Sequence, residues 1–353
     1  KFVKITWDEA YALAAQKLNE TIEECGPKGV QIISRGTDWL VRFRDALGTP
    51  NMAGHTDTCY TTHTWAWPAY VLGSSNKGKR PFTHDYANAT YLLSFGHDQV
   101  GRAQNTTVQG VIKALENGAM AAVFDPRLSN MAAKALAYGQ YYHTIKPGTD
   151  LAVMWAIIKW IVANSAWNAS FVSTYVNATT WADFVTYVNT NGFAQGELAP
   201  GADAAAVAAW AAAKAEVPAD DILQIAADFA GSARPVVMTH KRDGAAGPNY
   251  DNSWRSSACA VILNILVGAV DREGGEIIDR TFPLKSFDSV FVKPTLPAKE
   301  KDAAGVTYGR IDGRDQWKMV SGGQGSFGQV FKSIIDDDPY PVRFLFVNYY
   351  NNP

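Results

Sequence analysis

The chain has 353 residues, a length that predicts two domains, each able to bury its own core. Its 32 Lys and Arg residues nearly balance 34 Asp and Glu residues, and the formal net charge of -2 excludes nucleic acid and anionic membranes as expected partners. The three cysteines, Cys25, Cys59 and Cys259, are too widely spaced for a disulfide framework or a Cys-x-x-Cys metal knuckle. The most apolar run, 151–163, is shorter than the roughly 20 residues that cross a bilayer. It predicts a buried helix, and no transmembrane segment is expected in this chain.

Both ends of the chain resemble cut ends. It begins at Lys1 rather than Met and stops at Pro353, directly after a strand-like run. We therefore expect a fragment of a longer protein, with any signal peptide outside this sequence.

The first half of the chain predicts alternating helices and strands. Thr6 and Glu9 form a capping box ahead of a helical apolar stripe. The short apolar run at 30–34 has the pattern of a buried parallel strand. A βαβ unit is predicted over 89–126, where two apolar runs ending at Gly96 and Asp125 enclose a helical pattern.

The second half continues the same pattern and fixes the fold class. Two apolar runs at 235–239 and 342–347 flank a helix with apolar positions between 258 and 269. These elements predict an α/β fold with parallel sheets, in which ligands bind beyond the carboxyl ends of the strands. The loops of interest therefore follow strands, at 35–36, 96–98, 125–127, 240–242 and from 348 onward. The Ala-rich segment 191–216 predicts a surface helix or an insertion without chemistry.

Cys59 lies in a polar, turn-rich stretch with Thr and Asp neighbours rather than aliphatic ones. A lone cysteine is most often inert core filling. These surroundings instead favour a thiolate that acts as a nucleophile or as a soft metal ligand. His55 and His63 stand four residues on either side, so a zinc site is an alternative if this stretch is helical. Gly54 and Pro50 favour a loop, and the sequence shows no fourth zinc ligand.

Asp125 and Asp150 each follow a strand-like run. A carboxylate at such a strand end can accept hydrogen bonds from a ribose hydroxyl or a guanine edge. The alternative is that Asp125 caps a turn and Asp150 caps the helix over 151–163. The chain has neither a Gly-x-Gly-x-x-Gly motif nor a Walker loop, which leaves ordinary NAD or ATP binding without support.

Motifs in register along nearly the whole chain resemble the dimethyl sulfoxide reductase superfamily, the molybdopterin guanine dinucleotide oxidoreductases. They are Gly48-Thr-Pro-Asn51 with downstream Cys59, Leu92-Leu-Ser-Phe-Gly96, Val123-Phe-Asp-Pro-Arg127, Lys146-Pro-Gly-Thr-Asp150, Asn264-Ile-Leu-Val-Gly-Ala269 with Arg272-Glu-Gly-Gly275, and Asn352-Pro353. The resemblance implies two parallel-sheet α/β lobes, one inserted in the other, each holding one pterin dinucleotide at its strand ends. The outer lobe would be 1–57 with 232–353, and the inserted lobe 58–231.

The resemblance also implies a role for individual residues. Cys59 would be the protein ligand to molybdenum or tungsten, which two molybdopterin guanine dinucleotides hold. The residues that would line one dinucleotide are Gly96, His97, Asp98, Asp125, Arg127, Gly148 and Asp150. Those approaching the other dinucleotide or the substrate would be Asn348, Asn352 and the loop 241–244. The family usually has Asn-Pro where this chain has His97-Asp98, a departure that bears on the phosphate contacts of that loop.

Ligation by cysteine points, within the family, to a branch resembling polysulfide, thiosulfate, tetrathionate and arsenate reductases. The resemblance implies atom transfer from a small inorganic anion, whose charge His55, Lys241 and Arg242 would balance. The alternative for those three residues is a solvated basic turn and a loop histidine. The resemblance further implies a 4Fe-4S cluster in a domain outside this sequence, an iron-sulfur electron-transfer subunit, a membrane anchor subunit and a periplasmic or exported location.

Two other functions stay open. Cysteine-ligated relatives include acetylene hydratase-like enzymes and aromatic dehydroxylases, and the aromatic residues after Cys59 offer a pocket for a ring. These residues, which are more often only core, are Tyr60, Trp65, Trp67 and Tyr70. The second alternative is that the chain is a non-catalytic paralogue, which serves as a scaffold in an electron-transfer complex. Retention of Cys59 argues against that function.

Overall fold

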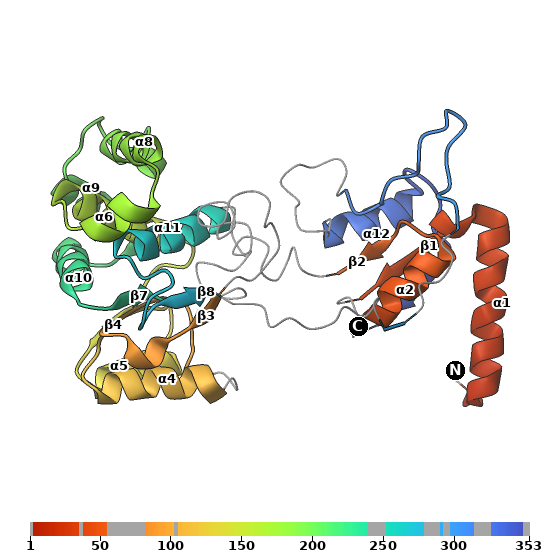
Figure 1. Cartoon of the computed structure of the whole chain (residues 1–353), viewed down its shortest axis with the longest axis horizontal. Helices are drawn as coiled ribbons and strands as arrows, with labels where there is room; N and C mark the ends of the chain where they lie inside the picture. The colour runs from red at the N-terminus through yellow and green to blue at the C-terminus, as the bar shows by residue number, and fades with distance from the viewer. Residues whose placement is uncertain are drawn as a thin grey trace. The chain divides into compact units, whose positions relative to one another are not determined.

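The computed structural model describes residues 3–34, 38–54, 82–101, 105–238, 252–278, 290–291, 297–313 and 326–348. The chain forms two compact units (Figure 1). The first consists of Lys1–Cys59 and Thr281–Pro353, and the second is the intervening Tyr60–Arg280. Each unit contains a parallel sheet with helices, which confirms the predicted α/β fold class.

The first unit holds a three-stranded parallel sheet in the order β2-β1-β9. Its elements are α1 (Trp7–Cys25), η1 (Pro27–Gly29), β1 (Val30–Ile33), α2 (Asp38–Leu47), β2 (Met52–Ala53), α12 (Phe327–Asp336) and β9 (Phe344–Val347). β1 lies at the centre and is buried along its whole length, which explains its nearly continuous apolar sequence. Because the strands are parallel, Ser34, Gly54 and Asn348 follow them at one edge, the carboxyl edge of the sheet.

The predicted N-terminal helix is α1, and its capping box is formed. The Glu9 N–H donates to Thr6 Oγ1 at 3.2 Å, and the Thr6 N–H donates to Glu9 Oε2 at 2.7 Å. Within the part of the chain that the structure describes, the apolar residues Trp7, Tyr11 and Leu13 of this helix are exposed.

The second unit holds a four-stranded parallel sheet in the order β6-β5-β4-β7 and a two-stranded antiparallel sheet, β3-β8. Its elements are β3 (Phe82–His84), η4 (Tyr86–Asn88), β4 (Tyr91–Phe95), α4 (Asn105–Glu116), β5 (Met120–Phe124), α5 (Asn130–Ala137), β6 (Tyr141–His143), α6 (Asp150–Ala163), α7 (Ala169–Tyr175), α8 (Ala178–Asn189), η5 (Gly192–Ala194), α9 (Ala204–Ala215), α10 (Ala219–Gly231), β7 (Pro235–Val237), α11 (Ser253–Leu266) and β8 (Glu276–Ile278). The predicted βαβ unit is β4-α4-β5. α4 and α5 lie on one face of the larger sheet, and α6 and α11 lie on the other (Figure 1).

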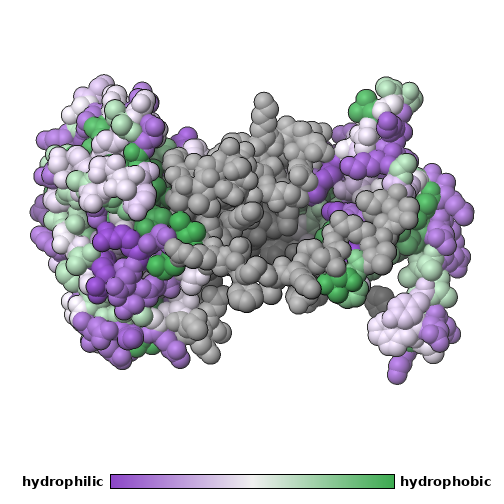
Figure 2. Space-filling view, viewed as in Figure 1, coloured by the Kyte–Doolittle hydropathy of each residue, from purple (hydrophilic) through white to green (hydrophobic). Residues whose placement is uncertain are grey.

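The core of the second unit centres on α6, the predicted buried helix. It packs against α9, α10 and α11 and is buried on nearly all sides. Over α4 and α5, by contrast, the visible surface is mostly hydrophilic (Figure 2). Among the described residues, no helix combines the length and the hydrophobicity needed to cross a bilayer.

The structure differs from the sequence prediction at the second boundary between the units. We predicted a return to the outer lobe at residue 232, but β7 pairs in parallel with β4 and the second unit continues to Arg280. Asn264 of α11 holds β7 from its other side, where its Oδ1 accepts from the Val237 N–H at 2.8 Å and its Nδ2 donates to the Val237 carbonyl at 3.2 Å. A short apolar strand looks the same whichever sheet it joins, so its sequence does not specify its neighbour.

The Ala-rich segment 191–216 also has a larger structural role than predicted. It forms η5 and α9, and α9 packs on α6. The side chains that it buries there are Val207, Ala208, Ala211 and Ala215. The segment therefore contributes to the core rather than lying wholly on the surface.

Candidate functional site

Two carboxylates come together at the carboxyl edge of the four-stranded sheet. Asp125 directly follows β5, Asp150 is the first residue of α6, and the two residues are only 4% and 7% exposed. Burial is the main reason that the pKa of Asp150 is raised to about 6. A hydrogen bond from the backbone of Asp150 lowers this pKa, and the negative charge of Asp125 raises it. A buried, coupled pair of carboxylates at a strand end is typical of a binding site.

Backbone turns hold both carboxylates in place. The Arg127 N–H donates to Asp125 Oδ1 at 3.1 Å, so Asp125 does cap a turn, the role that the sequence left as its alternative. Before α6, Gly148 has a φ of +84°, a conformation that favours glycine, and its carbonyl accepts from Asn252 Nδ2 at 3.0 Å. Thr149 occupies the N-cap position of α6, so Asp150 is not the cap of this helix.

The loop after β4 is anchored by Asp98. Its carboxylate accepts from the Met131 N–H at 2.9 Å and from Asn130 Nδ2 at 3.2 Å, at the start of α5, and from the Gly101 N–H at 3.1 Å. Partial burial acts to raise the pKa of Asp98, but these hydrogen bonds, led by that of Met131, lower it overall. Asp98, which we expected to line a dinucleotide, thus ties the loop to α5.

The neighbouring residues complete this edge. Gly96 has a φ of +64°, and its N–H donates to the Phe124 carbonyl at 2.6 Å. His97 is buried, and its carbonyl accepts from Ser94 Oγ at 3.2 Å. The side chain of Arg127 is 71% exposed, with Nη2 at 3.5 Å from Asp98 Oδ2. Its exposed guanidinium suits contact with a phosphate.

The donors and acceptors at this edge fit a guanine nucleotide. Ionised carboxylates only accept hydrogen bonds, so Asp125 and Asp150 suit guanine N–H groups or ribose hydroxyls. Gln99, in the loop after β4, is 2% exposed, and its Nε2 has no hydrogen-bond partner among the residues that the structure describes. Sequence reasoning missed Gln99, because a glutamine in a polar loop resembles a solvated residue and carries no motif.

The first unit presents polar groups at the corresponding edge of its own sheet. The Asn348 N–H donates to the Ile33 carbonyl at 2.9 Å, and Asn348 Oδ1 accepts from Ser34 Oγ at 3.4 Å. Asn348 therefore lies directly after β9 and beside the end of β1, where open α/β sheets bind their ligands.

The Gly48-Thr-Pro-Asn51 motif has a structural role in this unit. Asn51 is 1% exposed and lies at the amino end of β2, the opposite edge of the sheet. Its Nδ2 donates to the Lys28 carbonyl at 2.8 Å, and its Oδ1 accepts from the Ile311 N–H and the Tyr340 hydroxyl, both at 3.2 Å. This one side chain joins three separate segments of the unit.

Several predicted site residues lie outside the described residues. They are Cys59, His55, Lys241, Arg242 and Asn352, together with His63 of the alternative zinc site and the aromatic residues Tyr60, Trp65, Trp67 and Tyr70. Their roles stay predictions. Among the described residues, no group of three or more His, Cys, Asp or Glu side chains is placed to hold a metal ion.

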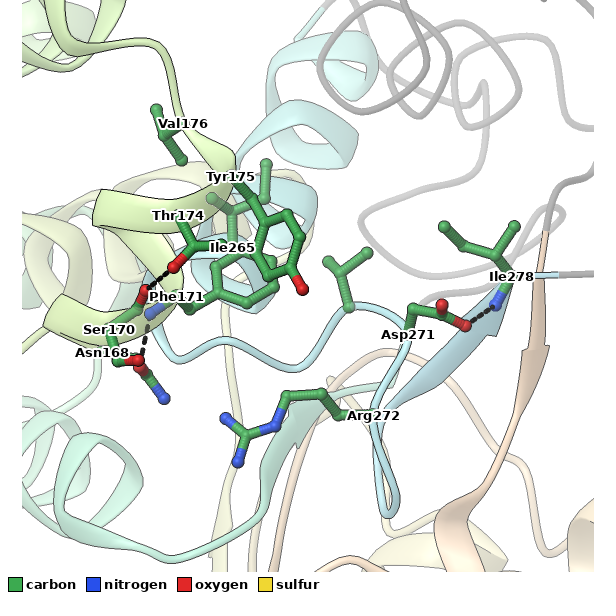
Figure 3. A pocket seen from close by; sticks show the side chains of 11 residues that line it. Asn168, Ser170, Phe171, Thr174, Tyr175, Val176, Ile265, Asp271, Arg272 and Ile278 are labelled. Atoms are coloured by element: carbon green, nitrogen blue, oxygen red, sulfur yellow. Dashed lines mark hydrogen bonds between the residues drawn. The ribbon is translucent and has the colours of Figure 1, made fainter.

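A cavity of about 690 Å³ lies elsewhere in the second unit (Figure 3). It is lined by α7, the end of α11 and the turn leading into β8, with the Phe171 and Tyr175 rings 5.0 Å apart. Asp271 on its rim accepts from the Ile278 N–H at 3.1 Å. None of the described residues that the sequence predicted for the site lines this cavity, so its size alone does not mark it as functional.

Comparison with known proteins gives the family. The model of the molybdopterin oxidoreductase family matches residues 1–276. The chain is 29% identical, over 98% of its length, to the thiosulfate reductase molybdopterin-containing subunit PhsA of Salmonella typhimurium. It is 26% identical, over 100% of its length, to the arsenate respiratory reductase molybdopterin-containing subunit ArrA of a Shewanella species. It spans 42% of the length of each of these relatives.

A solved structure shows the same fold. The structure of acetylene hydratase from Pelobacter acetylenicus matches with a TM-score of 0.72 and 19% identity, over 99% of this chain and 47% of that protein. At that identity the likeness concerns the fold alone, whereas the family model covers more than half of the chain. The chain therefore belongs to the molybdopterin oxidoreductase family, within the dimethyl sulfoxide reductase superfamily that its motifs resemble.

Proposed function

We propose that this chain is the central part of the catalytic subunit of a molybdenum or tungsten enzyme that reduces a small inorganic anion of sulfur or arsenic. The names of two relatives, a thiosulfate reductase and an arsenate respiratory reductase, support this substrate class. The observation that carries the cofactor assignment is the buried pair Asp125 and Asp150, because it offers acceptors to a guanine nucleotide at the strand ends.

In this proposal each unit holds one molybdopterin guanine dinucleotide. The residues of the second unit that would contact it are Gly96, His97, Asp125, Arg127, Gly148 and Asp150, with Asp98 anchoring their loop. Asn348 and Asn352 would serve the first unit. Cys59 would bind the metal through its thiolate, and the bound metal would supply the chemistry of atom transfer.

The cationic residues His55, Lys241 and Arg242 would bind the anionic substrate. Burying an anion without cationic partners is strongly unfavourable, so such groups are required close to the substrate. We further propose that electrons arrive through a 4Fe-4S cluster in a domain outside this sequence and through an iron-sulfur partner subunit. A membrane anchor subunit and a periplasmic or exported location complete the proposal.

The cofactor assignment is tested on the full-length protein purified without oxygen. Metal analysis should find molybdenum or tungsten, and acid treatment should release two equivalents of guanine nucleotide for each metal. Stoichiometric zinc without guanine would overturn the proposal and would favour the alternative site at His55, Cys59 and His63.

The substrate class is tested with a panel of thiosulfate, tetrathionate, polysulfide, arsenate, catechols and acetylene. Turnover is followed with a reduced viologen dye or by product analysis, and we expect turnover of one inorganic anion. An acetylene hydratase-like activity is the second candidate, because the acetylene hydratase of Syntrophotalea acetylenica is 24% identical over 50% of this chain. Turnover of acetylene or catechols alone would favour this candidate, and a metal-loaded protein inactive on the whole panel would favour a scaffold.

A further inference from the structure

Gln99 carries a buried amide nitrogen that finds no hydrogen-bond acceptor in the described part of the chain. The residue is 2% exposed, and within the described part of the chain its Nε2 has no hydrogen-bond acceptor. Leaving a buried N–H without an acceptor is unfavourable, and such groups are rare in native proteins. A bound ligand that carries an acceptor would supply the missing partner.

The loop that carries Gln99 is held in one conformation. The Gln99 N–H donates to the His97 carbonyl at 2.9 Å, and Asp98 ties the loop to α5. The Gly101 N–H donates to Asp98 Oδ1 at 3.1 Å, which fixes the backbone on the far side of Gln99 as well. The backbone that carries Gln99 is thus held at the end of β4 by its neighbours.

The charges along this edge give a bound nucleotide a direction. In the sheet order β6-β5-β4-β7, Asp125 follows β5 and the Gln99 loop follows the adjacent strand β4. The carboxylates of Asp125 and Asp150 attract hydrogen-bond donors of a base or ribose and repel phosphate. Phosphate oxygens therefore belong toward β4, where the Gln99 amide offers a donor and where the exposed Arg127 guanidinium, 3.5 Å from Asp98, offsets the negative charge of that carboxylate.

We propose that Gln99 is a cofactor-binding residue whose Nε2 donates a hydrogen bond to a phosphate oxygen of the guanine nucleotide, with the guanosine directed toward Asp125 and Asp150. This inference rests on the proposed function, since it assumes that a guanine nucleotide binds at this edge. It assigns the donor role to a residue outside the family motif, in the loop where His97-Asp98 replaces Asn-Pro.

The test compares wild type with Gln99→Leu in the full-length protein prepared free of cofactor, with GDP and guanosine as probes in isothermal titration calorimetry. Gln99→Leu should bind GDP at least about tenfold more weakly and should bind guanosine as wild type does. Its melting temperature without nucleotide should be unchanged or higher, because leucine removes an unsatisfied donor. Guanine released from the holoenzyme by acid should also fall.

Gln140→Leu is the matched control. Gln140 Oε1 accepts from the Ala121 N–H at 3.1 Å, and its Nε2 donates to the Tyr138 carbonyl at 3.0 Å, near the amino ends of the strands. Removing this satisfied amide should lower the melting temperature and leave the affinity for GDP unchanged. The two variants should therefore affect stability and binding in opposite ways.

The outcomes separate the inference from the proposed function. Failure of the wild type to bind GDP would overturn both. Equal GDP binding by wild type and Gln99→Leu would overturn the inference alone. An equal loss of affinity for GDP and for guanosine would also overturn it, because it would place Gln99 beside the base rather than the phosphate. A loss of stability like that of Gln140→Leu would show that the Gln99 amide has a structural partner, and would also overturn it.

Discussion

Burial and, after it, the negative charge of Asp125 raise the pKa of Asp150 to about 6. At neutral pH the folded protein therefore keeps most of a second negative charge in a buried position beside the first. This arrangement lowers stability, and binding sites commonly retain such groups because a ligand can supply hydrogen-bond donors to them.

Asp150→Asn should stabilise the cofactor-free protein at neutral pH and not in acid. An unfolded aspartate has a pKa of about 3.9, so a folded value of about 6 means that the native state binds the proton more tightly. The loss of folding stability that ionised Asp150 causes is absent below pH 4, grows between pH 4 and 6, and reaches about 3 kcal/mol above that range. Denaturant unfolding of both proteins from pH 4 to 8 measures the difference.

Other titrating groups cancel in this difference, because the two proteins share them. A gain in stability that is constant from pH 4 to 8 would contradict a titrating Asp150. The same variant should bind GDP more weakly, since an amide offers one acceptor in place of a carboxylate. A stabilised variant that binds GDP as tightly as wild type would remove Asp150 from the nucleotide site.

Asn51→Ala should destabilise the first unit by about 2–4 kcal/mol, because it removes the side-chain partner of the buried Lys28 carbonyl and Ile311 N–H, whereas the Tyr340 hydroxyl keeps its hydrogen bond to the Gly309 carbonyl. Thermal or denaturant unfolding measures the loss. Asn348→Ala is the control in the same unit, since among the described residues its side chain makes a single hydrogen bond, at 3.4 Å, and its loss should cost less than about 1 kcal/mol. Equal losses would contradict the joining role of Asn51.

Local patterns predicted those parts of the fold in which the pattern has one physical solution. The βαβ unit over 89–126 was correct because Gly96 and Asn117-Gly118 end its elements and its strands are buried on both faces. The sheet joined by β7 was not predictable, because Asn264, 27 residues away in sequence, holds its free side only after folding. Long-range contacts of this kind leave no local signal.

The candidate site was predictable to the same limited extent. The positions of Asp125 and Asp150 after apolar runs indicated carboxylates at strand ends, but their burial and coupling needed the folded structure. Asp98 lies in a family motif and yet anchors a loop, whereas Gln99 lies beside the motif and has a buried donor without an acceptor among the described residues. The family motif therefore indicated the loop after β4, but only the packing of the folded chain distinguished the roles of its side chains.

Cys59→Ala should abolish turnover and reduce bound metal with little loss of stability, because a loop thiolate that binds a metal contributes chemistry rather than packing. Cys259→Ala is the matched control. Cys259 is fully buried in α11, and burial raises the pKa of its thiol, so it is an inert part of the core. That variant should lose about 1–2 kcal/mol and keep its metal and activity. Metal analysis, turnover and melting temperature decide, and like behaviour of the two variants would make Cys59 structural.

Arg242→Ala should lower kcat/KM for the inorganic anion by a factor of ten or more, on the order of 1.4 kcal/mol of transition-state stabilisation. The reason is that an anion entering a buried metal site needs a cationic partner, and Lys241 alone is a weaker, point-like substitute for the guanidinium fork. Arg343→Ala removes the same charge from a surface pair with Asp337 and should leave kcat/KM unchanged.

The measurement is steady-state kinetics on the anion that the panel identifies, at two ionic strengths, since general attraction of substrate by the protein's charge weakens with salt. A loss of kcat/KM that both variants share and that salt removes would mean that Arg242 acts only through such general attraction. Turnover of acetylene or catechols alone, with Arg242→Ala unaffected, would remove the anion from the proposal and leave the fold and the cofactor assignment in place.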